Sequence, residues 1–191
     1  MSVDRRKLII EAASKSFSLF GYKATTMEQV AKLANVGKGT IYTFFTNKEE
    51  LFEEILQELI KHVQRIAQET ILARDSFHDN MHRFLYTVLE FRREHDLMIR
   101  MTNEITEMGT PAAKEGIRKV ESAVLALLSM KIKEAIERGD LRPCDPERTA
   151  FAMFRMYLAF VLEWEVTHPP LEKEEIANLF DLYFVEGLAA R

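Results

Sequence analysis

The chain is poor in cysteine and has no long apolar run. A single cysteine, Cys144, cannot form a disulfide within the chain, and there is no CxxC pair to hold a zinc ion. The most apolar stretch, 151–164, includes Arg155 and Glu163 and is shorter than the roughly 20 residues that a membrane span needs. No N-terminal stretch resembles a signal peptide. We therefore expect a cytoplasmic protein with no membrane association.

Proline and glycine are also sparse where they would interrupt helices. No proline precedes Pro111, and no glycine lies between Gly39 and Gly109. Apolar residues recur at steps of three and four, and no stretch alternates as a strand would. The sequence therefore predicts an all-α fold, with helices at about 4–20, 25–34, 38–44, 47–73, 77–94, 96–108, 112–138, 146–166 and 173–189.

Positive charge is concentrated at the N-terminal end. Residues 1–48 hold eight lysines and arginines against three acidic residues, a balance of +5, so the net charge of −4 leaves −9 for the remainder. A short window can reach this balance by accident. A basic head on an acidic body otherwise predicts that only the head meets phosphate. We predict a DNA-binding domain at 1–48 and a second domain at 49–191.

The local signals within the head predict two short helices joined by a tight turn. Gly21 is expected to end the first helix. The sequence Thr25-Thr26-Met27-Glu28 indicates a capping box with Thr25 at the N-cap and Glu28 three residues on. Asn35-Val36-Gly37 predicts the turn, and Asn47 is expected to cap a long fourth helix. This arrangement is typical of a DNA-reading helix-turn-helix.

The 38–44 helix has two distinct faces. Ile41, Phe44 and Phe45, with Gly37, are expected to pack inward. The outer face is small, polar and basic. Gly39 lets the backbone approach DNA, Tyr42 can donate to phosphate, and Thr43 can contact a base edge. We also expect Lys38 and Lys48 to contact phosphates, with Thr40 on the flank of the face.

These residues carry a family resemblance. The segment from Phe20 to Ala31, FGYKATTMEQVA, and the segment from Val36 to Leu51, VGKGTIYTFFTNKEEL, resemble the DNA-binding region of the TetR (tetracycline repressor-like) family. Beyond about residue 55 the likeness is one of helix layout and of Gly139-Asp140-Leu141-Arg142-Pro143. The family often has a second tyrosine and a histidine where this chain has Thr43 and Phe44.

The resemblance implies a homodimeric repressor whose C-terminal domain binds a small molecule and thereby releases an inverted-repeat operator in double-stranded DNA. It implies no cofactor and no enzymatic activity. The DNA contacts that it implies are Thr26, Lys38, Gly39, Thr40, Tyr42, Thr43 and Lys48.

The last two predicted helices are apolar on nearly every side. A body of about 140 residues is small for burying both completely, so we expect one side of each to meet a second subunit. The alternative is a pair of internal helices within a monomer. The predicted dimer residues are Tyr157, Val161, Trp164, Phe180 and Phe184.

Methionines and phenylalanines are frequent in the body. Together they fit an adaptable apolar pocket for a lipophilic or aromatic effector, although any one of them can be ordinary core. The residues predicted to line the pocket are Phe84, Phe91, Met98, Met101, Phe151, Phe154 and Phe160.

Other chemistry has weaker support. His78 and His82 are four residues apart and could share a metal, but a solvated helix start explains them better, and we predict no metal site. The sequence around Lys38 lacks the spacing of a phosphate-binding loop, and no catalytic motif is present. Three alternatives stay open: a ligand-responsive repressor, a DNA binder without a small-molecule ligand, and an enzyme, which nothing in the sequence supports.

Overall fold

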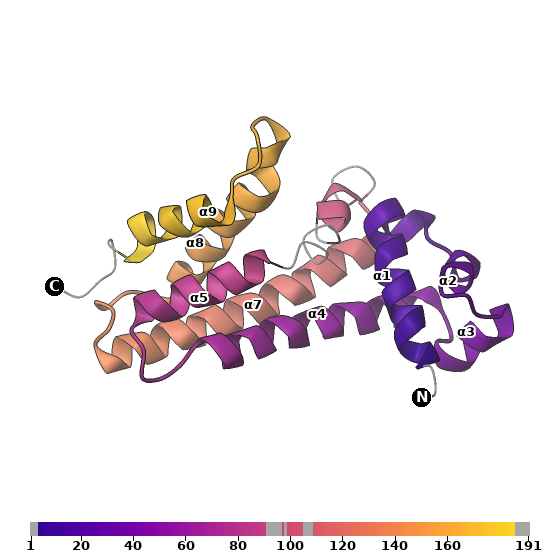
Figure 1. Ribbon diagram of the computed structural model, residues 1–191, viewed down its shortest axis with the longest axis horizontal. Helices are drawn as coiled ribbons and strands as arrows, with labels where there is room; N and C mark the ends of the chain where they lie inside the picture. The colour runs from indigo at the N-terminus through magenta and orange to yellow at the C-terminus, as the bar shows by residue number, and fades with distance from the viewer. Residues whose placement is uncertain (1–3, 91–96, 98, 105–108, 186–191) are drawn as a thin grey trace. The chain divides into compact units, whose positions relative to one another are not determined.

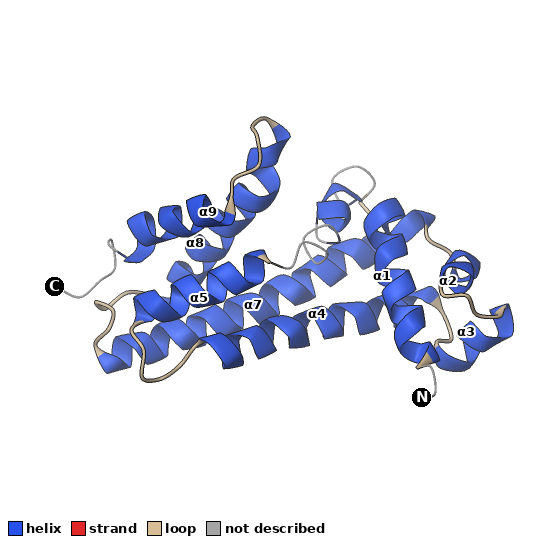
Figure 2. Ribbon diagram, viewed as in Figure 1, coloured by secondary structure: helices blue, strands red, loops and turns tan. Residues whose placement is uncertain are grey.

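The computed structural model describes residues 4–90, 97, 99–104 and 109–185, and its ordered elements are helical (Figures 1 and 2). No strand occurs within these residues, so the all-α prediction is confirmed. The α-helices are α1 (Arg5–Ala24), α2 (Met27–Leu33), α3 (Lys38–Phe44), α4 (Lys48–Thr70), α5 (Phe77–Leu89), α7 (Pro111–Arg138), α8 (Pro146–Leu158) and α9 (Lys173–Phe180). Shorter π- and 3-10-helical turns are η1 (Ala159–Glu163), η2 (Trp164–Val166) and η3 (Asp181–Val185).

The chain divides into two compact units. Unit 1 comprises Met1–Ile60 and Arg92–Val120, and unit 2 comprises Lys61–Phe91 and Glu121–Arg191. The predicted domain boundary after residue 48 stays a prediction. Unit 1 contains the head together with the first part of α4 and the start of α7.

The core of unit 1 joins α1, α3 and α4. Ile9, Phe17, Ile41 and Leu51 are completely buried. The Phe17 ring lies edge-on to Phe52, with 5.2 Å between centroids. These contacts fix the first turns of α4 against α1, and so hold the head as one body.

Gly116 of α7 allows a close approach to α4. A Cβ atom built on Gly116 would lie 2.8 Å from Leu56 Cδ1 and 2.9 Å from Phe52 Cε1. Real Cβ atoms do not approach carbon this closely, so only glycine fits this position without a shift of its neighbours.

The core of unit 2 gathers residues of α5, α7, α8 and α9. Ile132, Ala135 and Ala150 are completely buried, and Met153 is nearly so. Towards their C-terminal ends, α8 passes into η1 and α9 into η3. Both η1 and η3 are π-helical, a rare conformation in which backbone hydrogen bonds join residues five apart instead of four.

Helix α4 ends three residues before the predicted position, Ala73, because side chains of α5 take over its backbone groups. The guanidinium of Arg83 donates to Thr70 O at 2.6 Å. The amide of Asn80 accepts from Leu72 N at 2.8 Å and donates to Leu72 O at 2.9 Å. These bonds satisfy the backbone where the helix stops. The predicted 96–108 helix is described only at 97 and 99–104, which are helical.

The predicted capping box of α2 was wrong by one residue. Thr26, not Thr25, is the N-cap: its side chain accepts from Gln29 N at 3.2 Å, and Gln29 accepts from Thr26 N at 2.8 Å. Thr25 is instead buried, and its hydroxyl donates to Gly21 O at 2.8 Å. Gly21 has φ +84°, a break that α1 needs before its last residues.

Candidate nucleic-acid interface

Helices α2 and α3 are joined by a short turn that sets their mutual angle. Asn35 adopts φ +54°, a left-handed conformation that asparagine tolerates better than most residues. Val36 N donates to Ala31 O at 3.0 Å, which ties the turn to the end of α2. The predicted turn at 35–37 is confirmed, and two packed helices of seven residues each form the motif.

Helix α3 presents a polar outer face. Ile41 and Phe45 are buried, whereas Gly39, Tyr42 and Thr43 are exposed, and Thr40 lies at the edge with partial exposure. An added Cβ on Gly39 would meet no atom within 4 Å, so the backbone there is open to an approaching molecule. Thr43 Oγ1 donates to Thr40 O at 2.7 Å in the free protein. The inward and outward sides match the prediction for these six residues, whereas Gly37, which was predicted to pack inward, is exposed.

Phe44 departs from the prediction that it packs inward. Its side chain is 38% exposed, while that of Phe45 is only 2% exposed. The helix ends at Phe44, and the chain turns to extended backbone at Phe45, which takes the inward place beside Arg6, whose guanidinium lies 5.3 Å from the ring. Phe44 thus adds an apolar side chain to the exposed end of α3.

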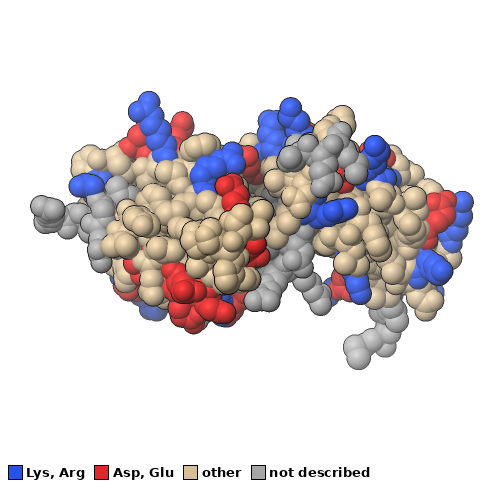
Figure 3. All heavy atoms as spheres, turned by 90° about the horizontal axis from the view of Figure 1, so that it is seen from above, with Lys and Arg blue, Asp and Glu red and all other residues tan. Residues whose placement is uncertain are grey.

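Basic and acidic side chains lie side by side on the surface of the head around α2 and α3 (Figure 3). Lys38, the first residue of α3, is exposed, and its ammonium lies 2.8 Å from Glu28 Oε1 of α2. Glu28 was not among the predicted site residues. Glu28 is one of the three acidic residues counted in 1–48, but its position beside α3 is apparent only in the folded structure.

The Lys48 side chain packs against the connection between α1 and α2. Its ammonium donates to Tyr22 O at 2.8 Å and to Thr25 O at 3.0 Å, and lies 4.4 Å from the centre of the Tyr22 ring. Tyr22 in turn donates its hydroxyl to Glu49 Oε1 at 2.7 Å. The first turn of α4 thereby holds the segment that leads to Thr26 and the start of α2.

The 99–104 segment holds the same connection from within unit 1. The buried carboxylate of Glu104 accepts from Lys23 N at 3.1 Å, and Arg100 donates to Phe20 O at 3.3 Å. A Cβ on Gly21 would overlap Glu104 Oε2. The local sequence predicted this glycine only as a helix end, because Glu104 lies 83 residues away and gives no local signal.

The predicted pocket residues separate into several environments. Phe84 and Phe154 are buried in the core of unit 2, and Phe160 packs against that core. Phe151 is 49% exposed beside Arg155, and Met101 is completely buried in unit 1. Phe91 and Met98 lie outside the described residues. The structure therefore brings together three of the seven predicted residues.

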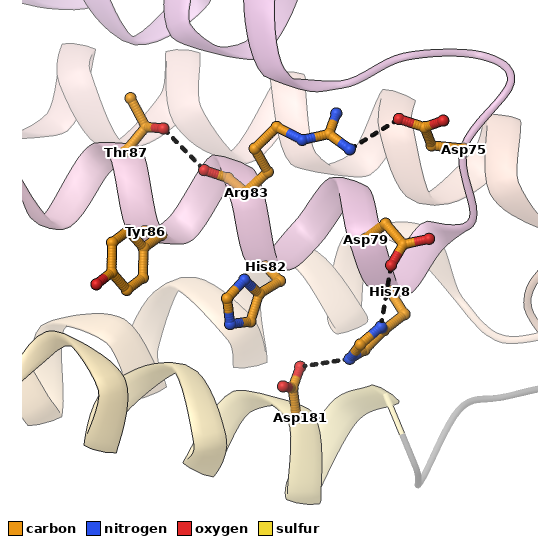
Figure 4. Close-up of a pocket in the computed structure, with 8 residues that line it drawn as sticks. All are labelled: Asp75, His78, Asp79, His82, Arg83, Tyr86, Thr87 and Asp181. Atoms are coloured by element: carbon orange, nitrogen blue, oxygen red, sulfur yellow. Dashed lines mark hydrogen bonds and ion pairs between the residues drawn. The ribbon is translucent and has the colours of Figure 1, made fainter.

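A polar pocket lies beside α5 in unit 2 (Figure 4). Its volume is about 580 Å³, and His78, His82 and Tyr86 project from one side of α5. Asp181 of η3 lies opposite His78, and the Tyr86 hydroxyl donates to Glu174 of α9. His78 lies between two acids, 3.5 Å from Asp79 Oδ1 and 3.4 Å from Asp181 Oδ1. Asp75, Asp79, Arg83 and Thr87 complete the lining. No group of three potential metal ligands with suitable geometry occurs among the described residues.

The predicted dimer residues also differ in exposure. Val161 and Phe180 are buried in the core of unit 2, and Tyr157 and Phe184 are partly buried against it. Trp164 is more exposed: its ring stacks on His168 with 3.9 Å between centroids, and its Nε1 donates to Pro169 O at 3.1 Å. The large apolar side chains left exposed in this unit include Phe151, which was predicted for the pocket, and Leu182 and Tyr183, which belong to no predicted site.

A helix-turn-helix with a buried inner face and a small, polar outer face defines a DNA-binding protein of the helix-turn-helix class. Comparison with known proteins narrows this class. Residues 9–55 match the family described as "Bacterial regulatory proteins, tetR family", and residues 74–188 match "Tetracyclin repressor-like, C-terminal domain". The chain belongs to the TetR family of DNA-binding transcriptional regulators, and the resemblance noted in its sequence is confirmed.

Individual relatives agree with this assignment. The HTH-type transcriptional regulator YhgD of Bacillus subtilis (strain 168) is 55% identical over 190 residues, which cover 100% of both chains. The HTH-type transcriptional regulator TtgR of Pseudomonas putida is 30% identical over 168 residues, 84% of this chain and 80% of that one. The SmeT–triclosan complex has a similar fold, with a TM-score of 0.82, 19% identity and coverage of 98% and 93%. YhgD and TtgR are named as transcriptional regulators, in agreement with the prediction of no enzymatic activity. No described helix is both long and apolar enough to cross a bilayer.

Proposed function

We propose that this protein is a homodimeric repressor that binds an inverted-repeat operator and leaves it when a small apolar molecule binds unit 2. The observation that carries the DNA-binding half is the exposed outer face of α3. The proposal places the protein in the cytoplasm, where operator DNA is available.

The proposed contacts follow from the exposed surface of the head. Gly39 admits the DNA backbone, Tyr42 donates to phosphate, and the Thr43 methyl and hydroxyl face a base edge. Thr26 and Thr40 lie at the edges of the same surface, and Lys38 and Lys48 supply positive charge. Lys48 in addition orients the α1–α2 connection through its two bonds to carbonyl oxygens.

Dimer formation is supported by exposed apolar side chains in unit 2. Leu182 and Tyr183 of η3 are each more than half exposed, and Phe151 of α8 is nearly so. Large apolar side chains left in water favour association with a second surface. We therefore place them in the interface together with Tyr157, Val161, Trp164, Phe180 and Phe184. Val161 and Phe180 are buried, so they contribute by packing beneath the exposed interface side chains.

The ligand half of the proposal is supported by Phe84, Phe154 and Phe160, which lie together in unit 2. SmeT, a protein of similar fold, is known in complex with triclosan, an apolar aromatic molecule. A DNA binder without any ligand is the second candidate, because Phe84 and Phe154 are buried in packed core.

Three measurements test the proposal. Selection of fragments from random duplex DNA should enrich an inverted repeat, and light scattering at micromolar concentration should give the mass of two chains. Tyr183→Glu should shift that mass towards one chain, whereas Tyr86→Glu, elsewhere in unit 2, should not. Triclosan should displace the enriched fragment from the protein. Enrichment without displacement by triclosan or by a library of apolar molecules would favour the second candidate, and a monomer would contradict the proposal.

A further inference from the structure

The ion pair between Glu28 and Lys38 joins the two helices of the helix-turn-helix at its exposed surface. Its N–O distance is 2.8 Å, and the lysine and glutamate side chains are 68% and 54% exposed. The hydrogen bond between the two side chains raises the pKa of Lys38 and lowers the pKa of Glu28. Both groups therefore stay charged at neutral pH.

Glu28 is the single acidic residue between Thr25 and Lys48, the stretch that forms the motif. The other two acids of residues 1–48 lie at α1, where Asp4 caps the helix and Glu11 is 4.0 Å from Lys7. Where a carboxylate beside the first turn of a recognition helix reaches DNA, it meets either phosphates, which repel it, or base edges in the major groove. Of the base-edge groups in that groove, amino groups such as N4 of cytosine are the partners that suit a carboxylate.

We propose that Glu28 determines DNA specificity: it keeps Lys38 from the phosphates of random DNA and accepts a hydrogen bond from a cytosine amino group in the operator. When the head binds random DNA, the Glu28–Lys38 ion pair stays intact and carries no net charge. Lys38 therefore neutralises no phosphate and releases no counterion from the DNA. On the operator the cytosine supplies a donor that compensates the carboxylate. This inference rests on the proposed operator binding and adds a residue that lowers binding to the wrong sequences.

The ion pair can be tested by the salt dependence of binding to random duplex DNA. Each phosphate that a protein neutralises adds about 0.9 to the slope of log K against log salt. Glu28→Gln should free Lys38, steepen the slope by about that amount and tighten binding to random DNA several-fold. Lys38→Gln should change the wild-type slope little, but should remove the added slope in the Glu28→Gln background.

Glu11→Gln is the matched control, because it removes the same charge from the head without freeing Lys38. It should produce only a small, general increase in affinity. Both acids are exposed, and thermal unfolding of each variant shows whether the head is intact. Glu28→Ala provides a second variant with the same expected change in slope.

The reading of cytosine is tested by fragment selection with wild type and Glu28→Gln. The variant should lose preference for cytosine at one position of each half-site, by roughly fivefold or more. The proposal is overturned if Glu28→Gln and Glu11→Gln have the same salt slope on random DNA and select the same sequence. It is also overturned if Lys38→Gln alone lowers the wild-type salt slope by about 0.9, the value for one phosphate contact. A failure of the proposed operator binding can be told apart from these two outcomes. In that case the wild-type protein would enrich no inverted repeat, while the salt slopes on random DNA could still be measured.

Discussion

Gly116 and Gly39 are both helical glycines, but their surroundings differ. Gly116→Ala places a methyl group against Phe52 and Leu56 and should destabilise the protein by about 1–3 kcal/mol, as overpacking does. Gly39→Ala meets no protein atom and should leave stability unchanged or raise it by up to about 1 kcal/mol. It should nevertheless weaken operator binding, because the new methyl faces DNA. Urea unfolding and operator titration of both variants check this, and equal effects on stability would contradict it.

Lys48 combines a charge with a structural task. Lys48→Ala removes two hydrogen bonds to carbonyl oxygens and should cost about 2 kcal/mol of stability. It should also weaken binding to operator and random DNA by similar factors, since the α1–α2 connection positions the whole head. Lys23→Ala, an exposed lysine on the same connection, serves as the control. A Lys48→Ala variant with unchanged thermal stability and only a flatter salt slope would assign the residue to phosphate alone.

Tyr22 predicts a dependence of stability on alkaline pH. Burial, and then the hydrogen bond to Glu49, raise the pKa of its hydroxyl above the ordinary value of about 10. The folded state therefore retains this proton where the unfolded state loses it, so the stability that Tyr22 contributes is present below about pH 10 and declines above it. Urea midpoints from about pH 8 to 11 should fall less steeply for Tyr22→Phe than for wild type. Parallel curves would show that Tyr22 does not contribute.

At the residue level, the sequence predicted which side of α3 is buried, but not which of two adjacent phenylalanines is. Phe44 and Phe45 have the same hydrophobicity, and the choice depends on the end of α3, where Phe45 leaves the helix with extended backbone. The shift of the capping box from Thr25 to Thr26 has a similar origin. Either threonine can cap, and burial of Thr25 against Ser16 decides between them.

Among the elements, the 99–104 segment has a specific contact with the head. Glu104→Ala leaves the Lys23 N–H without its acceptor and should cost about 1–3 kcal/mol, with weaker operator binding. Glu104→Gln keeps an acceptor oxygen and should restore most of both properties. Thermal unfolding and operator titration measure the two effects, with Glu115→Ala as an exposed control in unit 1. If the glutamine variant is as weak as the alanine variant, the negative charge matters rather than the hydrogen bond.

Helix existence was predictable from the sequence, while several helix ends were not. The 3.6-residue period identifies α1, α4, α5 and α7 because each buries one face over several turns. The end of α4 depends on Asn80 and Arg83, which are distant in sequence from its last turn. The change from α8 to the π-helical η1 likewise follows no local breaker, since neither glycine nor proline occurs between Pro146 and Trp164.

For the whole molecule, operator and effector should oppose each other equally. If a ligand lowers operator affinity by a coupling of about 1–3 kcal/mol, or about 5–150-fold, then operator must lower ligand affinity by the same factor. Titration calorimetry with the ligand found by displacement should therefore give weaker binding to the DNA complex than to the free protein. Equal affinities would exclude coupling between the two sites even where the ligand binds well.

The family and the all-α architecture could be predicted because the head is encoded locally: turn, caps and apolar period all lie within about fifty residues. The body was predicted less well. Its pocket and dimer residues were chosen as apolar, but apolar side chains fill both cores and interfaces. Phe154 and Phe151 differ in burial although they are three residues apart on one helix.

Trp164 is the single tryptophan of the chain, and it stacks on His168 in the turn between α8 and α9. When the protein is excited at a wavelength that only indole absorbs, all of the emission therefore comes from Trp164. A protonated imidazole in van der Waals contact quenches indole emission, so separating the two rings while the histidine is charged brightens it. The intact, unlabelled protein thus carries an optical reporter within the proposed dimer surface, able to follow assembly in real time.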